Sequence, residues 1–273
     1  MKKLILPILL VFVSICVQAA EVDTIQVFSK SMQKEIKVVV VKPAQYKKKK
    51  LRFPVVYLLH GYSGSYAQWV KDAPLLMQHA DQFNQLLVCP DGGYNSWYFD
   101  SPVEPSVRYE TFCSSELINA IDAQYRTIAD KSARAITGLS MGGHGAMYLA
   151  IRHTDVFGAA GSICGGVDIR PFPKSWDMTR VLGNPATNQE NWEKNTVINV
   201  VDQLQNGSVK LIIDCGLGDF FLQVNRAFHQ KLVEKKIDHE YIERPGVHNK
   251  AYWGNAIGYQ LYYFNNFFKQ VKA

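Results

Sequence analysis

The sequence predicts an α/β protein built on one doubly wound, mostly parallel sheet with antiparallel strands at its start. Two observations lead to this prediction. From residue 53 onward, short apolar segments alternate with longer segments of helical periodicity, an order typical of parallel strands joined by helical crossovers. Before them, residues 24–29 and 35–42 read as the two strands of a hairpin, and the strands of a hairpin are antiparallel.

The later elements follow from the same local patterns. Each strand is expected at a short, mainly apolar run, and each helix where apolar residues recur three and four positions apart. The expected order after the hairpin is strand 53–59, helix 67–80, strand 86–89, helix 110–124, strand 133–139, helix 142–152, strand 157–163, strand 209–215, helix 220–236, strand 239–244 and helix 252–268. Residues 90–109 and 165–206 show no clear period and are expected to be irregular. Because ligands of such sheets bind beyond the carboxyl ends of the strands, site residues are expected in the loops that follow strands.

The chain divides into a leader and one domain. Lys2 and Lys3 precede an apolar run, and Val17-Gln18-Ala19 offers small residues where a signal peptidase cuts. We therefore expect a signal peptide over residues 1–19, export to the periplasm or beyond, and no membrane span. Lipoprotein anchoring through Cys16 is the alternative, but Ile15 stands where a lipidation signal has a small residue. Residues 20–273 are expected to form a single catalytic domain.

Charge and cysteine content exclude several classes of partner. Residues 20–273 carry 28 basic and 24 acidic side chains, a balance too mild to predict nucleic-acid binding. No Cys-x-x-Cys or His-x-x-x-His pattern supports a zinc site, so no metal site is expected. Four cysteines follow the leader, namely Cys89, Cys113, Cys164 and Cys215. In an exported protein they can be disulfide-bonded or buried free thiols, and their pairing stays open.

A Gly-x-Ser-x-Gly sequence nominates Ser140 as a nucleophile. An apolar strand runs into Gly138-Leu139-Ser140-Met141-Gly142 and continues directly as a helix. A serine at the tip of such a turn has a strained backbone, so Gly138 and Gly142 are needed where side chains would clash. The alternative is a glycine-rich turn that merely packs tightly. The start of the helix also directs backbone N–H groups toward a developing negative charge.

The catalytic base and acid are expected in loops that follow strands. His248 ends the loop that leaves strand 239–244, and Asp219 lies in the glycine-rich loop after strand 209–215. Ser140, Asp219 and His248 then occur in the order nucleophile, acid, base that is typical of serine hydrolases on parallel sheets. Asp214 is the runner-up for the acid, although its place inside a strand favours a buried, hydrogen-bonded carboxylate.

The other histidines fit structural roles better. His239 begins a strand and so lies at the wrong edge of the sheet. His79, His153 and His229 lie on or beside helices, and His144 points along the helix after Ser140, where it is expected to pack and hydrogen-bond.

An oxyanion hole needs two backbone donors. Met141, the residue after the proposed nucleophile, is expected to supply the first, and Tyr62, in the loop after strand 53–59, the second. Gly61 permits the bend of that loop, and His60 is expected to brace it.

Several motifs together resemble the esterase D branch of the α/β-hydrolases, which includes feruloyl and acetylxylan esterases, S-formylglutathione hydrolases and mycolyltransferases. The matching residues are Leu59-His60-Gly61, Tyr109-Glu110-Thr111-Phe112 with Glu116-Leu117, Gly138 to Gly143, Cys215 to Asp219, and Pro245 to His248. The resemblance covers residues 53–273. It implies the α/β-hydrolase fold and places nucleophile, acid, base and oxyanion donors on Ser140, Asp219, His248, Tyr62 and Met141.

The resemblance also implies cofactor-free hydrolysis of carboxylic esters through an acyl-enzyme. For an exported member it favours short acyl or aryl esters of carbohydrates, such as acetyl or feruloyl esters. Loop 62–65 matches no single subgroup and leaves the natural ester open. An acyltransferase that uses the same acyl-enzyme, and a non-catalytic binding module on this fold, are the alternatives.

Aromatic residues near the expected site are candidates for substrate binding. The loop 92–100 holds Tyr94, Trp97, Tyr98 and Phe99 beyond a strand end, and aromatic rings suit flat acyl groups or sugars. We expect Trp97, and secondarily Trp253 near His248, to contact substrate. The alternative is that these rings hold a long loop to the domain.

Overall fold

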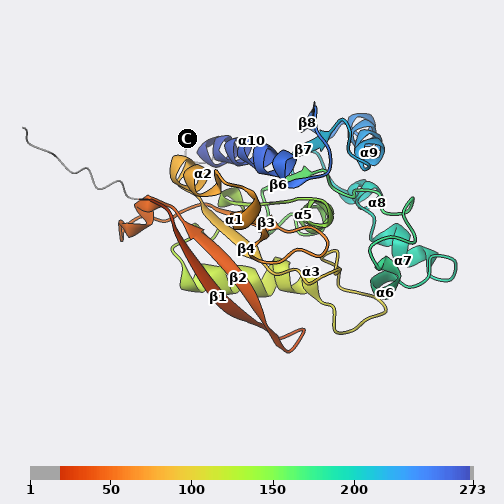
Figure 1. Ribbon diagram of the computed structural model, residues 1–273, viewed down its shortest axis with the longest axis horizontal. Coiled ribbons are helices and arrows are strands. Elements are labelled where there is room, and N and C mark those ends of the chain that lie inside the picture. Colours follow the sequence, from red (N-terminus) through yellow and green to blue (C-terminus); the bar gives the residue numbers. More distant parts are fainter. Residues whose placement is uncertain (1–18, 271–273) are drawn as a thin grey trace, which may run out of the picture.

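A computed structural model describes residues 19–270 of the chain (Figure 1). Apart from Ala19, the predicted signal peptide lies outside these residues, as does Cys16. Between residues 19 and 270, no helix combines the length and the apolar character needed to cross a membrane.

One mixed sheet of eight strands organises the described residues, with the order β1-β2-β4-β3-β5-β6-β7-β8. The strands are β1 (Glu21–Ser29), β2 (Lys34–Lys42), β3 (Val55–Leu59), β4 (Leu86–Pro90), β5 (Arg134–Gly138), β6 (Ala159–Ile163), β7 (Lys210–Gly216) and β8 (His239–Arg244). β2 pairs antiparallel with β1 and β4, and the remaining pairs are parallel. The predicted mostly parallel sheet with antiparallel N-terminal strands is confirmed.

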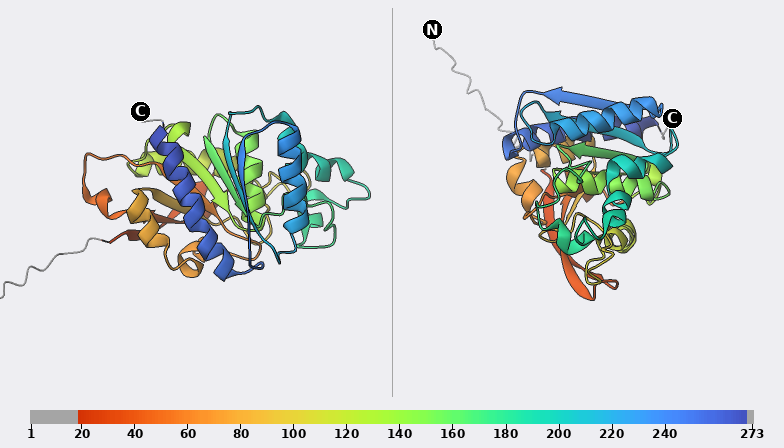
Figure 2. Two further views of the ribbon diagram at one scale, coloured as in Figure 1. Left: turned by 90° about the horizontal axis from the view of Figure 1, so that it is seen from above. Right: turned by 90° about the vertical axis from the view of Figure 1, so that its right-hand side faces the viewer.

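Helices cover both faces of the sheet, and α9 and α10 lie on opposite sides of it (Figure 2). Val55, Tyr57 and Leu59 of β3 belong to the core shared with α4, α5 and α9, whereas Val56 and Leu58 belong to the core shared with α1, α2 and α10. The main helices are α1 (Gln68–Asp72), α2 (Leu76–Phe83), α4 (Leu117–Gln124), α5 (Met141–Arg152), α9 (Leu222–Glu234) and α10 (Lys250–Gln270). Strands covered on both faces are continuously apolar, which explains why their pattern was legible in the sequence.

Two expected elements differ in the structure. The single helix predicted for 67–80 is two helices, α1 and α2, because Pro74 lies between them and cannot donate the hydrogen bond that a continuous helix needs. The segment 165–206, expected to be irregular, contains α6 (Met178–Leu182), α7 (Gln189–Lys194) and α8 (Val197–Val200). Helices of four to six residues are too short to show a period.

The helix expected at 110–124 begins as α3 (Tyr109–Thr111) and passes through a π-helical turn, Phe112–Glu116, before α4. The buried Glu110 of this segment accepts hydrogen bonds from Tyr148 and Arg152 and lies 2.9 Å from His153. His153 therefore has a structural partner, as its sequence position suggested.

Candidate active site

Ser140 occupies a strained turn between β5 and α5. Its φ of 57° and ψ of −118° lie outside the common regions for a residue with a side chain, and its N–H donates to the Ile163 carbonyl at 2.9 Å. A Cβ on Gly138 would lie 2.4 Å from the Gly142 backbone, and one on Gly142 would lie 2.3 Å from the Leu59 carbonyl oxygen. Both flanking glycines are thus required by close backbone approach, as the motif predicted.

The structure brings the three residues nominated from the sequence together. His248 Nε2 lies 2.9 Å from Ser140 Oγ, and His248 Nδ1 lies 2.7 Å from Asp219 Oδ2. An ionised carboxylate only accepts, so Nδ1–H donates to Asp219 and leaves Nε2 to accept from the serine hydroxyl. This is the arrangement in which a histidine can remove the serine proton.

Asp219 is held in place by its own loop. It lies beyond β7, is 6% exposed, and its Oδ1 accepts the Phe221 N–H at 2.8 Å. Asp214, the runner-up, is fully buried inside β7 and accepts hydrogen bonds from Tyr252 and Arg244. Its partners are structural, as the sequence favoured.

The surroundings of His248 favour its charged form. Burial lowers the pKa of an imidazole, but the hydrogen bond to Asp219 and the contact with Cys164 outweigh burial and raise the pKa of His248 to about 9. A carboxylate partner stabilises imidazolium, which is the species formed when a histidine accepts a proton from serine.

The two predicted oxyanion donors are available. Within residues 19–270, the backbone N–H groups of Tyr62 and Met141 donate to no protein acceptor. His60 braces the loop as expected, because its Nδ1 lies 2.8 Å from the Gly61 carbonyl oxygen and its Nε2 accepts the Gly92 N–H at 2.7 Å. The Tyr62 hydroxyl also donates to Asp177 at 3.0 Å, which ties this loop to the start of α6.

His144 has the packing role expected from the sequence. It is fully buried, its Nε2 lies 3.0 Å from the Asn195 carbonyl oxygen, and its ring stacks on Tyr148. Burial lowers the pKa of His144 to about 4, so this imidazole is neutral.

The predicted substrate-binding residues lie in different environments. Trp97 is 1% exposed and packs against His144 and Trp176. A ring so deeply buried offers almost no surface to a substrate, so its burial supports the alternative role of holding the loop. Trp253 is half-buried, and its ring lies edge-on to His248 with centroids 5.1 Å apart.

Phe220 and Trp176 also lie beside the site and were missed. Phe220 is 53% exposed, its ring centroid lies 4.3 Å from that of His248, and it stacks on Trp176. Phe220 directly follows Asp219, so its proximity could have been inferred. Trp176 comes from the 165–206 segment, whose path no sequence pattern revealed.

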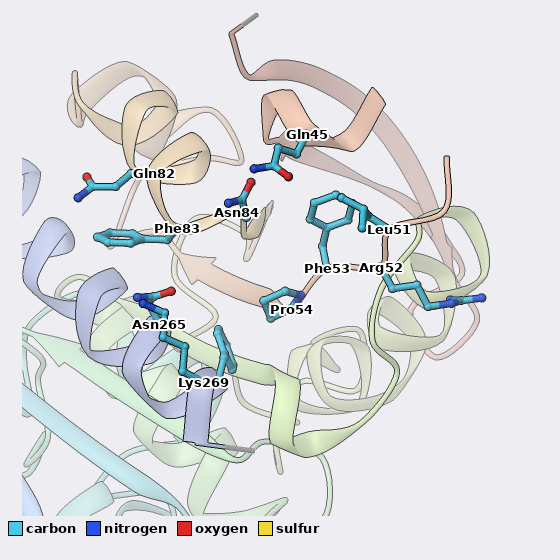
Figure 3. Close-up of a pocket in the computed structure, with 11 residues that line it drawn as sticks. Gln45, Leu51, Arg52, Phe53, Pro54, Gln82, Phe83, Asn84, Asn265 and Lys269 are labelled. Atoms are coloured by element: carbon cyan, nitrogen blue, oxygen red, sulfur yellow. The ribbon is translucent and has the colours of Figure 1, made fainter. Parts of the chain in front are cut away.

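Of two hollows in the surface, one lies at the edge of the sheet opposite Ser140 and the other adjoins the oxyanion loop. A hollow of about 420 Å³ between Pro54, Phe83 and Lys269 lies where the parallel strands begin, at the edge opposite Ser140 (Figure 3). A hollow of about 230 Å³ adjoins the oxyanion loop. Its lining comprises Ser63, Gly64, Ser65, Ala67, Gln68, Lys71 and Asp72.

The four cysteines Cys89, Cys113, Cys164 and Cys215 are free and buried. Within residues 19–270, donor atoms of Cys164, Asp219 and His248 lie within 4.8 Å of one another. Because Asp219 and His248 Nδ1 already hydrogen-bond to each other, a metal ion would have to displace that bond.

Comparisons with known proteins show which family the chain resembles. Residues 29–263 match the family model described as "Putative esterase". An acetyl esterase from Caldicellulosiruptor saccharolyticus is 26% identical over 258 residues, which cover 85% of this chain and 94% of that protein. Esterase Rv1288 from Mycobacterium tuberculosis is 28% identical over 235 residues, and the match spans about half, 51%, of its length and 77% of this chain.

A solved ferulic acid esterase superposes with a TM-score of 0.80 at 28% identity and covers 91% of this chain and 98% of its own. The fold is therefore that of the α/β-hydrolases. The family match spans most of the chain. The chain belongs to the esterase D-like family and is a carboxylic ester hydrolase of the serine hydrolase class.

Proposed function

We propose that this enzyme releases short acyl or aryl groups from carbohydrate esters through an acyl-enzyme on Ser140. The observation that carries the assignment of roles is the continuous hydrogen-bonded series from Asp219 through His248 to Ser140, with separations of 2.7 and 2.9 Å. Each atom has a partner suited to its role in proton transfer.

The proposed reaction has two halves. Ser140 Oγ attacks the ester carbonyl while His248 Nε2 takes the serine proton, and the Tyr62 and Met141 N–H groups receive the oxyanion. The carbonyl reforms, the alcohol leaves with the proton from His248, and the acyl group stays on Ser140. Water then attacks the acyl-enzyme with the same base, which releases the acid and restores the serine.

Two features of the surface support a carbohydrate ester. Trp176 and Phe220 provide an aromatic rim beside His248, which suits a flat acyl group or a sugar ring. The hollow beside the oxyanion loop presents hydroxyl, amide and charged groups, which suit sugar hydroxyls. The names of the acetyl esterase and ferulic acid esterase relatives point the same way.

The test uses chromogenic acetyl and feruloyl esters and the corresponding acylated xylo-oligosaccharides. Ser140→Ala and His248→Ala should each lower kcat by several orders of magnitude, and Asp219→Asn should be nearly as severe because it removes the group that stabilises imidazolium. Intact folds, checked by circular dichroism, are the control. A Ser140→Ala variant with wild-type turnover would reject the assignment.

The same assay separates the alternatives. Free acid as the main product supports hydrolysis, whereas transfer of the acyl group to an added sugar, faster than to water, would replace the esterase proposal by an acyltransferase. Binding of oligosaccharide without any turnover would indicate a binding module.

We also propose export with cleavage beside Ala20. The first strand, β1, begins at Glu21. The N–H of the preceding residue, Ala20, donates to Asp81 Oδ2 at 3.0 Å. Cleavage after Ala19 would place a charged amino terminus at this carboxylate.

A further inference from the structure

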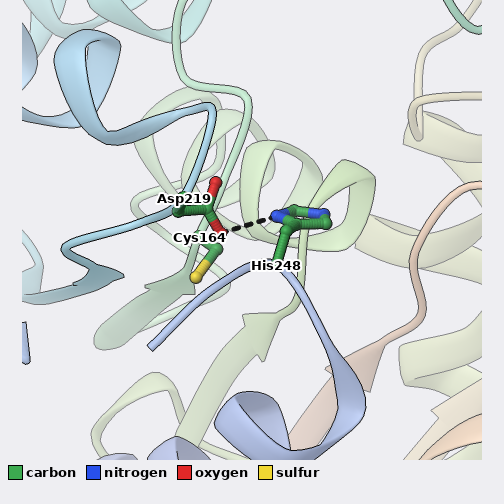
Figure 4. Close-up of side chains that lie close together, drawn as sticks. All are labelled: Cys164, Asp219 and His248. Atoms are coloured by element: carbon green, nitrogen blue, oxygen red, sulfur yellow. Dashed lines mark hydrogen bonds and ion pairs between the residues drawn. The ribbon is translucent and has the colours of Figure 1, made fainter. Parts of the chain in front are cut away.

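Cys164 lies beside the hydrogen-bonded pair of Asp219 and His248 (Figure 4). It follows the last residue of β6, and its N–H donates to the Asp214 carbonyl of β7 at 2.7 Å. Its φ of 48° lies in the left-handed region, which residues other than glycine, asparagine and aspartate seldom adopt. The backbone between β6 and β7 therefore holds this side chain in one direction at the cost of local strain.

The Cys164 thiol lies close to both Asp219 and His248. Cys164 is fully buried, and its Sγ lies within 4.8 Å of both a carboxylate oxygen of Asp219 and a ring nitrogen of His248. Asp219 already receives the Phe221 N–H and the His248 Nδ1–H.

The thiol acts as a neutral group. A contact with Cys215, together with burial, raises the pKa of Cys164 far above that of an ordinary thiol. It is therefore neither a thiolate nucleophile nor a counter-ion. A neutral sulfur can still accept weakly from an imidazolium N–H and restrict the rotation of the ring.

We propose that Cys164 is a positioning residue that holds the His248 ring against Asp219. The inference rests on the proposed roles of Ser140 and His248. The titratable groups next to the ring are Cys164 from the end of β6 and Asp219 from the loop after β7. Cys215 at the end of β7 contacts Cys164, and Asp214 within β7 is hydrogen-bonded to Arg244 and Tyr252.

The direction of the effect follows from these contacts. The Cys164 contact raises the pKa of His248, so its removal should move the acid limb of kcat/KM to lower pH. A looser ring should also lower kcat while KM, set by groups at the mouth of the site, stays within about twofold. Since misplacement by about 1 Å can cost up to about 100-fold in rate, we expect about a tenfold loss of kcat.

The experiment compares Cys164→Ala, Cys164→Ser and Cys89→Ala, using a soluble acetyl ester, full pH profiles and thermal melting. Cys89 is an equally buried free thiol on β4, so its variant measures the general cost of removing a sulfur from the core. Cys164→Ala should lose kcat and shift the acid limb, Cys164→Ser should restore most of both because its oxygen also accepts a hydrogen bond, and Cys89→Ala should change only the melting temperature.

Two outcomes are distinguishable. If Ser140→Ala is inactive but Cys164→Ala keeps the wild-type kcat and acid limb, the positioning role is wrong and the proposed function stands. If Ser140→Ala itself remains active, the proposed function fails first. Should Cys164→Ala not fold, Cys164→Gly takes its place, because it also lacks the sulfur and glycine adopts the positive φ of this position readily. A wild-type kcat and acid limb in Cys164→Gly would equally overturn the role.

Discussion

At the scale of single residues, His248 receives opposing influences, and their balance sets a pH dependence. The base must be neutral to accept the serine proton, so kcat/KM should fall as the pH decreases through the pKa of free His248. Burial lowers that pKa, but Asp219 and Cys164 raise it to about 9. The acid limb should therefore lie above the ordinary histidine value of about 6.5.

A profile of kcat/KM against pH with a rapidly hydrolysed acetyl ester measures this limb. Asp219→Asn should move it downward, because the stabilising carboxylate is lost. Activity that stays flat down to about pH 4 would contradict a histidine base.

Trp97 is predicted to act through stability. Its ring is 1% exposed and packs against His144 and Trp176, so Trp97→Ala should cost about 3–5 kcal/mol of unfolding free energy. Urea unfolding measures this cost, and the ratio of kcat/KM for feruloyl and acetyl esters should stay unchanged. In the comparison variant Trp176→Ala, whose ring is only half-buried, that ratio should fall and the cost in stability should be smaller than for Trp97→Ala. A selective loss of feruloyl activity in Trp97→Ala would restore its substrate-binding role.

The residues at the centre of the site were more predictable than those around it. Ser140, Asp219 and His248 each follow a strand that the apolar pattern shows clearly. Because ligands of such sheets bind beyond the carboxyl ends of the strands, these loops could be nominated from the sequence. The aromatic character of Trp97 does not reveal which side of a loop is buried, so the sequence could not decide between substrate binding and holding the loop. Cys164 carried no signal of its own, since its proximity to His248 depends on a left-handed turn after β6.

At the scale of elements, the turn from β5 to α5 depends on its contact with β3. A Cβ on Gly142 would lie 2.3 Å from the Leu59 carbonyl oxygen and 2.6 Å from that of His60, and backbone atoms cannot swing aside as a side chain can. Gly142→Ala should therefore push α5 away from β3, with a cost of about 1–3 kcal/mol.

The same shift should lower kcat by about 100-fold, because Ser140 and the Met141 N–H move together. Chemical unfolding and steady-state kinetics test both effects. Gly207→Ala is the comparison, since a Cβ there would meet nothing within 4 Å, and its cost comes from the positive φ of 83° alone. Equal, small losses in both variants would show that close packing at Gly142 does not matter.

Strands were easier to predict than short helices for a physical reason. β3, β5 and β7 are covered on both faces, so most of their residues are apolar. α6, α7 and α8 each span fewer than two helical turns, and tertiary contacts rather than a repeating pattern stabilise them. The break at Pro74 was visible in the sequence but was outweighed by the apolar period on either side.

At the scale of the whole molecule, the order of the strands in the sheet brings the residues of the proposed site together. β5, β6, β7 and β8 are consecutive parallel neighbours, so loops that are distant in sequence open side by side at one edge. Ser140, Cys164, Asp219 and His248 follow these four strands in turn. The strand order therefore explains why residues separated by 108 positions share a hydrogen bond.

The start of the folded chain offers a test of the proposed export. Asp81 Oδ2 accepts the Ala20 N–H at 3.0 Å, and Asp81 Oδ1 accepts the Ala44 N–H. After cleavage behind Ala19, the amide of Ala20 would become an ammonium group, and hydrogen bonds between charged partners are stronger than neutral ones. We therefore expect mass spectrometry of the exported protein to find Ala20 as its first residue.

The charge of the new amino terminus should also change the stability of the protein. Processed and unprocessed chains, each with Asp81 or with Asp81→Asn, form a double cycle in which the loss of the Ala44 hydrogen bond cancels. Asp81→Asn should cost about 1 kcal/mol more in the processed form, which corresponds to about 2–4 °C in Tm for a domain of this size. Raising the pH above the pKa of the terminal amine, about 8, should remove this excess because the ammonium loses its charge. Equal losses in both forms at every pH would mean that Asp81 binds only the backbone, and an intact Met1 on the exported protein would contradict cleavage itself.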